Sequence, residues 1–161
     1  MLINIIKVFF TNAPMKKFML EVELMLHFSG KNRILRKYFQ RRIYYKYNCE
    51  ISHSSKIDTS VRFIHPIAIV IGSNAIIEKN CMIYQCVTIG STASDNNKMP
   101  YIKEGTIVYA GAKLIGGITI GKNCTVGANA VVTKSVPDNS IVVGVNKIHK
   151  KTKENIQNDI F

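Results

Sequence analysis

The chain has 161 residues and a mass of 18.1 kDa, which suits a single domain whose core is large enough to fold without disulfides or metal. Hydrophobic residues make up 47% of it and charged residues 20%, a balance that excludes an intrinsically disordered chain. Charged residues interrupt each apolar stretch before it reaches roughly 20 residues, so we expect no transmembrane helix. The cysteines form no Cys-x-x-Cys pair and the N-terminus shows no secretory pattern, and we therefore expect a reduced, cytoplasmic setting.

Residues 1–48 predict a short α-helical segment. The spacing of apolar residues indicates one helix over about 15–28, after an Asn-Ala-Pro sequence, and a second over about 31–48, after Ser-Gly. The net charge of +12 is concentrated here, because this segment holds ten lysines and arginines against Glu21 and Glu23.

Basic and apolar side chains interleave over residues 31–46 with the period of an amphipathic helix. Three interpretations of this basic face stay open. It is a solvated helix surface, or it is attracted to an anionic membrane or glycan-lipid at the inner face of the membrane, or it binds nucleic acid. Nucleic acid is the least favoured, because no recognised nucleic-acid-binding motif accompanies the helix.

From Ile51 onward, aliphatic residues recur every six positions. The first positions of these hexads are all apolar: Ile51, Ile57, Phe63, Ile71, Ile77, Ile83, Ile89, Ile102, Val108, Leu114, Ile120, Val126 and Val132. A six-residue period is typical neither of a helix nor of an ordinary strand. It matches a parallel β-helix, in which each hexad supplies a short strand and a turn, three hexads close a triangular coil, and the aliphatic positions stack inward. The predicted domain covers residues 49–146.

Two irregularities interrupt the array. A slip of two residues separates Phe63 from Ile71, and the polar stretch 90–101 falls out of phase, which predicts a loop extruded from a coil edge. The fifth hexad position is small or apolar, so Cys81 and Cys124 are predicted core residues. Residues 147–161 are polar and predict a C-terminal tail, either mobile or packed on a partner.

Several segments of the array resemble the hexapeptide-repeat acyltransferases, and the chain is similar to their serine acetyltransferase branch over about residues 49–148. The segments are Ile64-His65-Pro66, 87–90, 111–116 and 126–137. The resemblance implies a mainly β fold, a left-handed parallel β-helix with a short α-helical N-terminal segment. It also implies a homotrimer that transfers acetyl groups from acetyl-CoA, bound as a co-substrate between neighbouring subunits, with no tightly bound cofactor.

The resemblance makes His65 the candidate general base and Glu50, fifteen residues earlier, its orienting acid. An imidazole with a pKa near its usual value of about 6.5 can take the proton of an attacking alcohol, and a carboxylate on its other nitrogen would fix the tautomer. His27, His53 and His149 lie outside this pattern, and we expect structural roles for them.

The family pattern also implies contacts to acetyl-CoA. Small residues would lie beside the pantetheine arm, and a threonine and lysines would lie toward the nucleotide end. The residues that match are Gly111, Ala112, Ala128 and Ala130 for the arm, with Thr133, Lys134 and Lys147 at the nucleotide end. The alternative for the alanines is ladder packing, and for Lys134 it is an ordinary surface charge.

The acceptor is where the sequence departs from serine acetyltransferases, which carry an Asp before the catalytic His and an Arg-His-Pro in the loop. Here these places read Ile64 and Lys98-Met99-Pro100, so groups that would pair with a zwitterion are missing. The build is more similar to the exopolysaccharide acetyltransferases typified by the colanic acid biosynthesis enzyme. We therefore expect a saccharide hydroxyl of a capsule, exopolysaccharide or O-antigen unit, with Lys98 and Met99 near it, and keep serine O-acetylation for cysteine biosynthesis as the alternative.

Other classes on this fold fit less well. A γ-type carbonic anhydrase needs three histidines on zinc, whereas the array holds only His53 besides His65, so we expect no metal. A non-enzymatic trimeric scaffold would not need an edge histidine, an extruded loop and a Thr-Lys pair together.

Overall fold

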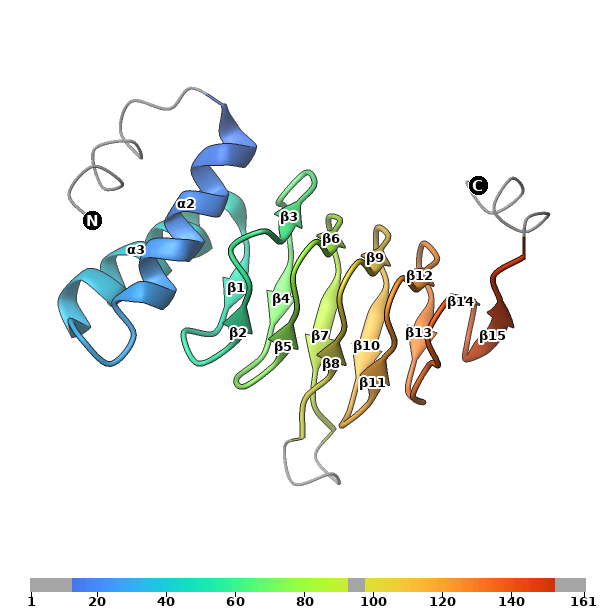
Figure 1. Cartoon of the computed structure of the whole chain (residues 1–161). Coiled ribbons are helices and arrows are strands. Elements are labelled where there is room, and N and C mark those ends of the chain that lie inside the picture. Colours follow the sequence, from blue (N-terminus) through green and yellow to red (C-terminus); the bar gives the residue numbers. More distant parts are fainter. Residues whose placement is uncertain (1–12, 93–97, 153–161) are drawn as a thin grey trace.

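The computed structural model of the protein describes residues 13–92 and 98–152, where helices at one end lead into a long stack of short strands (Figure 1). Residues 1–12, 93–97 and 153–161 lie outside the described part. They include the start of the predicted helical segment, the centre of the predicted loop and most of the predicted tail.

Helices α2 (Pro14–His27) and α3 (Arg33–Tyr47) confirm the predicted pair to within a few residues. Pro14 starts α2, where the missing N–H costs nothing, and the side chain of Asn32 caps α3 by accepting hydrogen bonds from the amides of Ile34 and Leu35. The two helices lie side by side across the first coil (Figure 1). Their inner faces bury aromatic and aliphatic residues against each other and against the strands.

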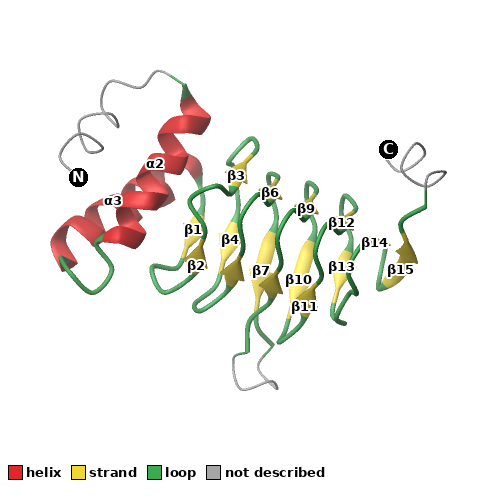
Figure 2. Ribbon diagram, viewed as in Figure 1, coloured by secondary structure: helices red, strands yellow, loops and turns green. Residues whose placement is uncertain are grey.

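The strands are very short and are joined by turns of a few residues (Figure 2). They are β1 (Glu50–Ile51), β2 (Lys56–Ile57), β3 (Arg62–Phe63), β4 (Val70–Ile71), β5 (Ile76–Ile77), β6 (Met82–Ile83), β7 (Thr88–Gly90), β8 (Tyr101–Ile102), β9 (Ile107–Val108), β10 (Lys113–Ile115), β11 (Thr119–Ile120), β12 (Thr125–Val126), β13 (Val131–Val132), β14 (Ser140–Val143) and β15 (Lys147–Lys150).

From β1 to β10, each strand pairs in parallel with the third strand after it, and β14 and β15 extend one of the three sheets that result in the described residues. Sheet A runs β1-β4-β7-β10-β13, sheet B runs β2-β5-β8-β11, and sheet C runs β3-β6-β9-β12-β14-β15. The sheets are the faces of a left-handed β-helix, as the sequence predicts. Successive first-position residues lie in register, for example Ile51 against Ile71 and Ile71 against Ile89.

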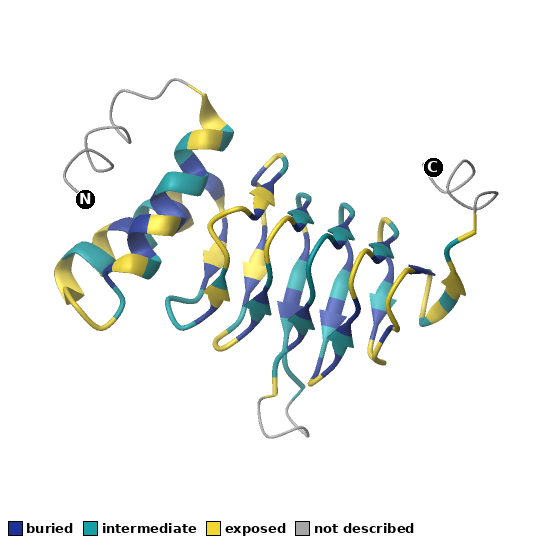
Figure 3. Cartoon of the chain, in the orientation of Figure 1, coloured by how far each residue is buried: buried dark blue, intermediate teal, exposed yellow. Residues whose placement is uncertain are grey.

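The aliphatic ladder fills the inside of the coils (Figure 3). The first hexad positions are buried, except Ile57, which is half-buried near α2. Cys81 and Cys124 are fully buried in the fifth-position ladder, which confirms their prediction as core residues. Thr106 is a buried polar member of that ladder, and its hydroxyl is satisfied because it donates to the Gly121 carbonyl and accepts from the Cys124 amide.

The C-terminal end of the array differs from the prediction. Lys147–Lys150 was expected to start a polar tail, but it forms β15, which pairs antiparallel with β14. The strand covers the edge that sheet C would otherwise expose at the end of the stack, a reason that hexad periodicity cannot reveal. Among the described residues, no helix is long and apolar enough to cross a membrane.

Candidate active site

The two-residue slip lies in the turn between β3 and β4, at the edge where sheet C meets sheet A. Later coils cross this edge through shorter turns at 84–87, 109–112 and 127–130. We call this row of turns the His65 edge. Amide hydrogen bonds hold it in register, from Cys86 to the Ile67 carbonyl at 2.9 Å and from Gly111 to the Gln85 carbonyl at 2.9 Å. The extra residues make the turn at His65 longer than its neighbours.

His65 lies exposed in this longer turn and has a left-handed backbone, with φ of 49°. Its carbonyl accepts a hydrogen bond from the Ile67 amide at 2.7 Å, which closes a tight turn. Non-glycine residues in this conformation are uncommon and cluster at functional sites. Along the described chain, the other non-glycine residues with positive φ are asparagines except for Ala68 and Cys86, which lie on the same edge.

The imidazole borders a hollow of ≈ 530 Å³ between the end of α3 and the β3–β4 turn. Its lining is mostly apolar, with Lys46 as the cationic side chain: Pro14, Met15, Lys46, Tyr47, Asn48, His65, Pro66 and Ile67. Burial, with the nearby Glu21 carboxylate, raises the pKa of Tyr47 to about 12, so this phenol stays neutral at physiological pH. The hollow therefore brings the Lys46 cation near the imidazole, whereas the Tyr47 hydroxyl is buried and has no hydrogen-bond partner among the described residues.

Glu50 does not contact His65 in this structure. It lies in β1 on the outer side of sheet A, opposite Val70 in register, and borders a neighbouring hollow that includes Lys37 and Arg41. Within the described part of the chain, neither the Glu50 carboxylate nor the His65 ring makes a side-chain hydrogen bond or ion pair. The predicted pairing of base and orienting acid is thus not formed here.

The predicted pantetheine contacts lie on the same edge as His65. Gly111 is in the turn before β10 and has φ of +74°, and a Cβ there would come within 2.0 Å of the Asn129 side-chain oxygen. Ala128 is exposed in the turn before β13. Ala112 and Ala130 are the last residues of these turns and are fully buried, the position of ladder residues. The turns beyond His65 therefore carry small residues at Gly111 and Ala128.

Thr133 and Lys134 lie at the opposite edge of sheet A, in the turn that leaves β13. They line an open hollow of ≈ 530 Å³ with the turn at Gly116 and Gly117. Thr133 is fixed by Asn146, whose side chain accepts from the Thr133 amide and donates to its hydroxyl, each at 2.8 Å. Within one chain, the width of sheet A thus separates Thr133 and Lys134 from His65.

The remaining predicted residues are placed as follows. Lys147 is exposed at the start of β15, beside the turn at Gly144 that ends the His65 edge. Lys98 is exposed in the predicted loop, whereas Met99 is half-buried and packs over Gly72, where a Cβ would lie 2.5 Å from its Cε. The position of Met99 is that of a packing residue anchoring the loop to the coil below.

Sequence reasoning missed three side chains on the His65 edge. Tyr84 and Tyr109 lie in successive turns, with ring centroids 5.0 Å apart, in register with Ile64. The Gln85 side-chain oxygen is buried and has no hydrogen-bond partner among the described residues. Aligning the hexads across the slip would have placed these residues beside His65.

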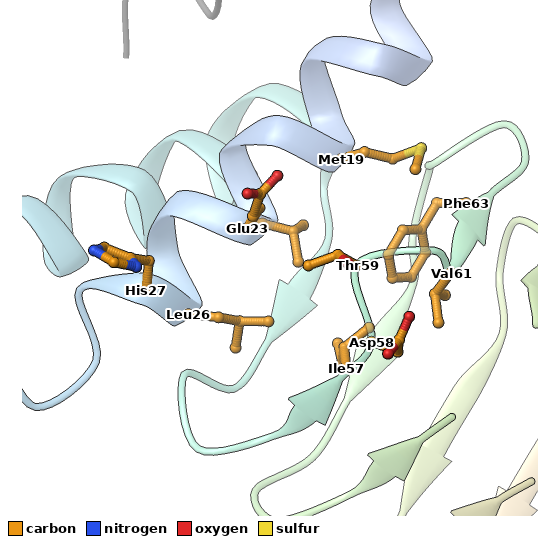
Figure 4. Close-up of a pocket in the computed structure, with 10 residues that line it drawn as sticks. Met19, Glu23, Leu26, His27, Ile57, Asp58, Thr59, Val61 and Phe63 are labelled. Carbon is orange, nitrogen blue, oxygen red and sulfur yellow. The ribbon is translucent and has the colours of Figure 1, made fainter. Parts of the chain in front are cut away.

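A separate hollow of ≈ 290 Å³ lies under α2, against the turn between β2 and β3 (Figure 4). Apolar side chains such as Leu26 and Phe63 dominate its lining, with Glu23 and Asp58 at its rim. None of the predicted site residues borders it. Among the described residues, no three His, Cys, Asp or Glu side chains gather in an arrangement that could hold a metal ion.

The sequence is similar to those of known acetyltransferases. Residues 99–134 match the family described as bacterial transferase hexapeptide (six repeats). The serine acetyltransferase of Haemophilus influenzae is 36% identical over 109 residues, which are 67% of this chain and 41% of that protein. That of Buchnera aphidicola is 37% identical, covering 77% of this chain and 49% of the relative. That of Bacillus pumilus is 35% identical, covering 77% and 65%.

Solved structures agree with these relatives. A serine acetyltransferase in complex with cysteine superposes with a TM-score of 0.80 at 30% identity, covering 90% of this chain and 59% of that one. A serine acetyltransferase in complex with CoA superposes with a TM-score of 0.71 at 32% identity, covering 78% and 52%. The chain thus spans between two fifths and two thirds of the length of these curated relatives.

Proposed function

We propose that this chain, whose β-helix is that of a hexapeptide-repeat transferase of the serine acetyltransferase type, is an acetyl-CoA-dependent O-acetyltransferase with His65 as its general base. The observation that carries the proposal is the His65 edge. A longer turn presents an exposed imidazole there, at the head of a row of turns in which Gly111 and Ala128 leave room beside the neighbouring Tyr84 and Tyr109 rings for a thin pantetheine chain.

The proposed reaction needs one base and no resident cofactor. His65 takes the proton of the acceptor hydroxyl as its oxygen attacks the thioester carbonyl carbon. The new C–O bond forms, the C–S bond breaks, and the proton passes from the imidazolium to the CoA sulfur. General base catalysis of this kind contributes roughly 10² to 10⁴ in rate.

For the acceptor, the comparisons favour L-serine over the saccharide that the sequence analysis preferred. The curated relatives described above are serine acetyltransferases, and none of these three is described as a colanic acid acetyltransferase. Lys46 in the His65 hollow suits the carboxylate of an amino acid. A saccharide hydroxyl stays the second candidate because Ile64 and Met99 provide no charge for an ammonium group.

We further propose that the complete site forms between copies of the chain. His65 and Lys134 lie at opposite edges of sheet A, so a single CoA molecule that touches both needs the His65 edge of one copy to face the Lys134 edge of the next. This heterologous contact closes into a ring, and the triangular coil suits a trimer.

The experiment is release of free thiol from acetyl-CoA by the purified full chain, followed with a chromogenic thiol reagent. L-serine is compared with L-alanine, which lacks the hydroxyl, and with a panel of sugar nucleotides and capsular oligosaccharides. Turnover with L-serine alone supports the main proposal. Turnover only with a saccharide replaces the acceptor but keeps the chemistry, and no turnover with any hydroxyl contradicts the proposal.

A further inference from the structure

The outer face of α3 carries large apolar residues that the fold does not use. Phe39 and Ile43 point inward and are buried, whereas Ile34 is 81% exposed, Tyr45 is 76% exposed and Tyr44 is 54% exposed. Exposed residues recur along α3 at the end of the stack (Figure 3). Leaving so much apolar surface in water on one helix is typical of an interaction surface.

The same face is strongly cationic. Arg33, Lys37, Arg41 and Lys46 are exposed, and the helix contains no acidic residue. Ile34, Lys37, Tyr38, Arg41 and Tyr45 follow one helical stripe and line a shared shallow groove. We call this stripe, with Arg33 and Lys46, the α3 outer face.

We propose that the α3 outer face docks on an anionic lipid bilayer. A helix that lies in a membrane interface needs an apolar stripe to enter the acyl boundary and flanking cations to meet anionic headgroups, and this face has both. Tyrosine suits that depth because its ring is apolar and its hydroxyl is polar. The lysine and arginine stems can lie along the apolar stripe while their charged ends reach the headgroups.

Other occupants fit this face less well. Two copies meeting through it about a two-fold axis would bring Lys37 and Arg41 against the same cations of the partner. A nucleic acid would bind the cations, but the highly exposed Ile34 side chain cannot form hydrogen bonds with phosphates or base edges. The stripe sets Ile34, Tyr38 and Tyr45 directly beside cations, and this mixture of large apolar side chains with positive charge fits an anionic bilayer.

The first test is co-sedimentation of the full chain with vesicles of mixed phosphatidylglycerol and phosphatidylcholine, against vesicles of phosphatidylcholine alone. We expect binding to the anionic vesicles only, weakened by salt. The double variant Lys37→Ala/Arg41→Ala should weaken binding about 25-fold, about fivefold for each cation. The matched control Lys56→Ala/Arg62→Ala removes the same charge from exposed positions on the β-helix, and should change binding by less than about twofold.

The second test uses the absence of tryptophan from the sequence. Tyr45→Trp gives a single reporter on the α3 outer face, and Val145→Trp gives one at the far end of the stack, where Val145 is also exposed. With anionic vesicles, emission from the first should shift to the blue and that from the second should not. The proposal is overturned by any of four results: equal binding to neutral vesicles, equal losses in the two double variants, a shift of the residue-45 emission with protein concentration alone, or a stronger shift with duplex DNA than with vesicles.

Discussion

The turn that carries His65 exceeds its neighbours along the edge by two residues, and His65 is exposed in it with a left-handed backbone. Its carbonyl closes a tight turn with the Ile67 amide, while its ring has no side-chain partner among the described residues. A ring held in this way is free to take a proton from a bound acceptor. The contribution of Glu50 to catalysis can be measured directly.

Glu50→Gln keeps the size of the side chain and removes its charge. If Glu50 orients or stabilises the His65 imidazolium in the assembled site, kcat should fall about tenfold, as expected for loss of one charge-assisted hydrogen bond, while KM for acetyl-CoA stays the same. Steady-state kinetics of the variant check this. An unchanged kcat would remove Glu50 from the catalytic machinery, and an equal change in KM would indicate a binding role.

The hydrogen bonds of the Glu78 carboxylate predict that the stability of the fold depends on pH, whatever the catalytic activity. Its carboxylate accepts hydrogen bonds from the Tyr101 hydroxyl and from the Glu104 amide, which lower its pKa below the usual 4.5. The folded state therefore gains stability above that value and loses it as pH falls through the lowered pKa. Glu78→Gln should reduce the urea midpoint at neutral pH, and the difference from wild type should shrink in acid.

The control for this prediction is Glu104→Gln. Among the described residues, the carboxylate of Glu104 pairs with the exposed Lys79 at 3.4 Å, so the loss of its charge should cost less than about 0.5 kcal/mol. A wild-type advantage over Glu78→Gln that stays constant down to strongly acidic pH would contradict the assignment.

The two helices are joined by a buried ion pair. Glu21 on α2 is fully buried and its carboxylate accepts a hydrogen bond from Arg42 on α3 at 2.8 Å. Arg42→Ala would leave that carboxylate uncompensated and should destabilise the protein by about 3 kcal/mol. Chemical denaturation at fixed protein concentration measures this, with the exposed neighbour Arg41→Ala as the control, expected within about 0.5 kcal/mol. Equal midpoints for the two variants would show that the pair does not hold the helices.

The strands show which parts of the fold the sequence alone predicts. The six-residue period of Ile71, Ile77, Ile83 and Ile89 identifies the β-helix because each coil repeats the same burial, and the structure places all four inside. By contrast, β15 follows no hexad, since it forms only to cover the free edge of sheet C. A sequence repeat predicts environments that recur from coil to coil. It does not predict a strand such as β15, which pairs with a single edge at the end of the stack.

The site was predictable in part for the same reason. The slip coincides with the turn of His65, and the structure places Gly111 and Ala128 on the same edge, while their contact with pantetheine stays a prediction. The Glu50–His65 contact was not found, because a spacing of fifteen residues fixes neighbouring coils but not the direction of a side chain on the outside of a sheet. The unpaired Gln85 oxygen could be recognised only once its burial was known.

The whole molecule should be a trimer if the site is shared between copies. Light scattering coupled to size exclusion should give a mass of three chains of 18.1 kDa each. The edges that hold His65 and Lys134 would then lie in the subunit contacts. A monomer at micromolar concentration that still turns over acetyl-CoA would contradict the shared site.

The most direct test of the proposed chemistry is the rate of acetyl transfer to L-serine by His65→Ala beside wild type, with thermal unfolding of both proteins as the check on folding. His65 is exposed and its side chain has no partner in the described structure, so the variant should keep its unfolding midpoint. Its kcat should fall by roughly 10² to 10⁴. A folded variant that transfers acetyl at the wild-type rate would show that His65 is not the base.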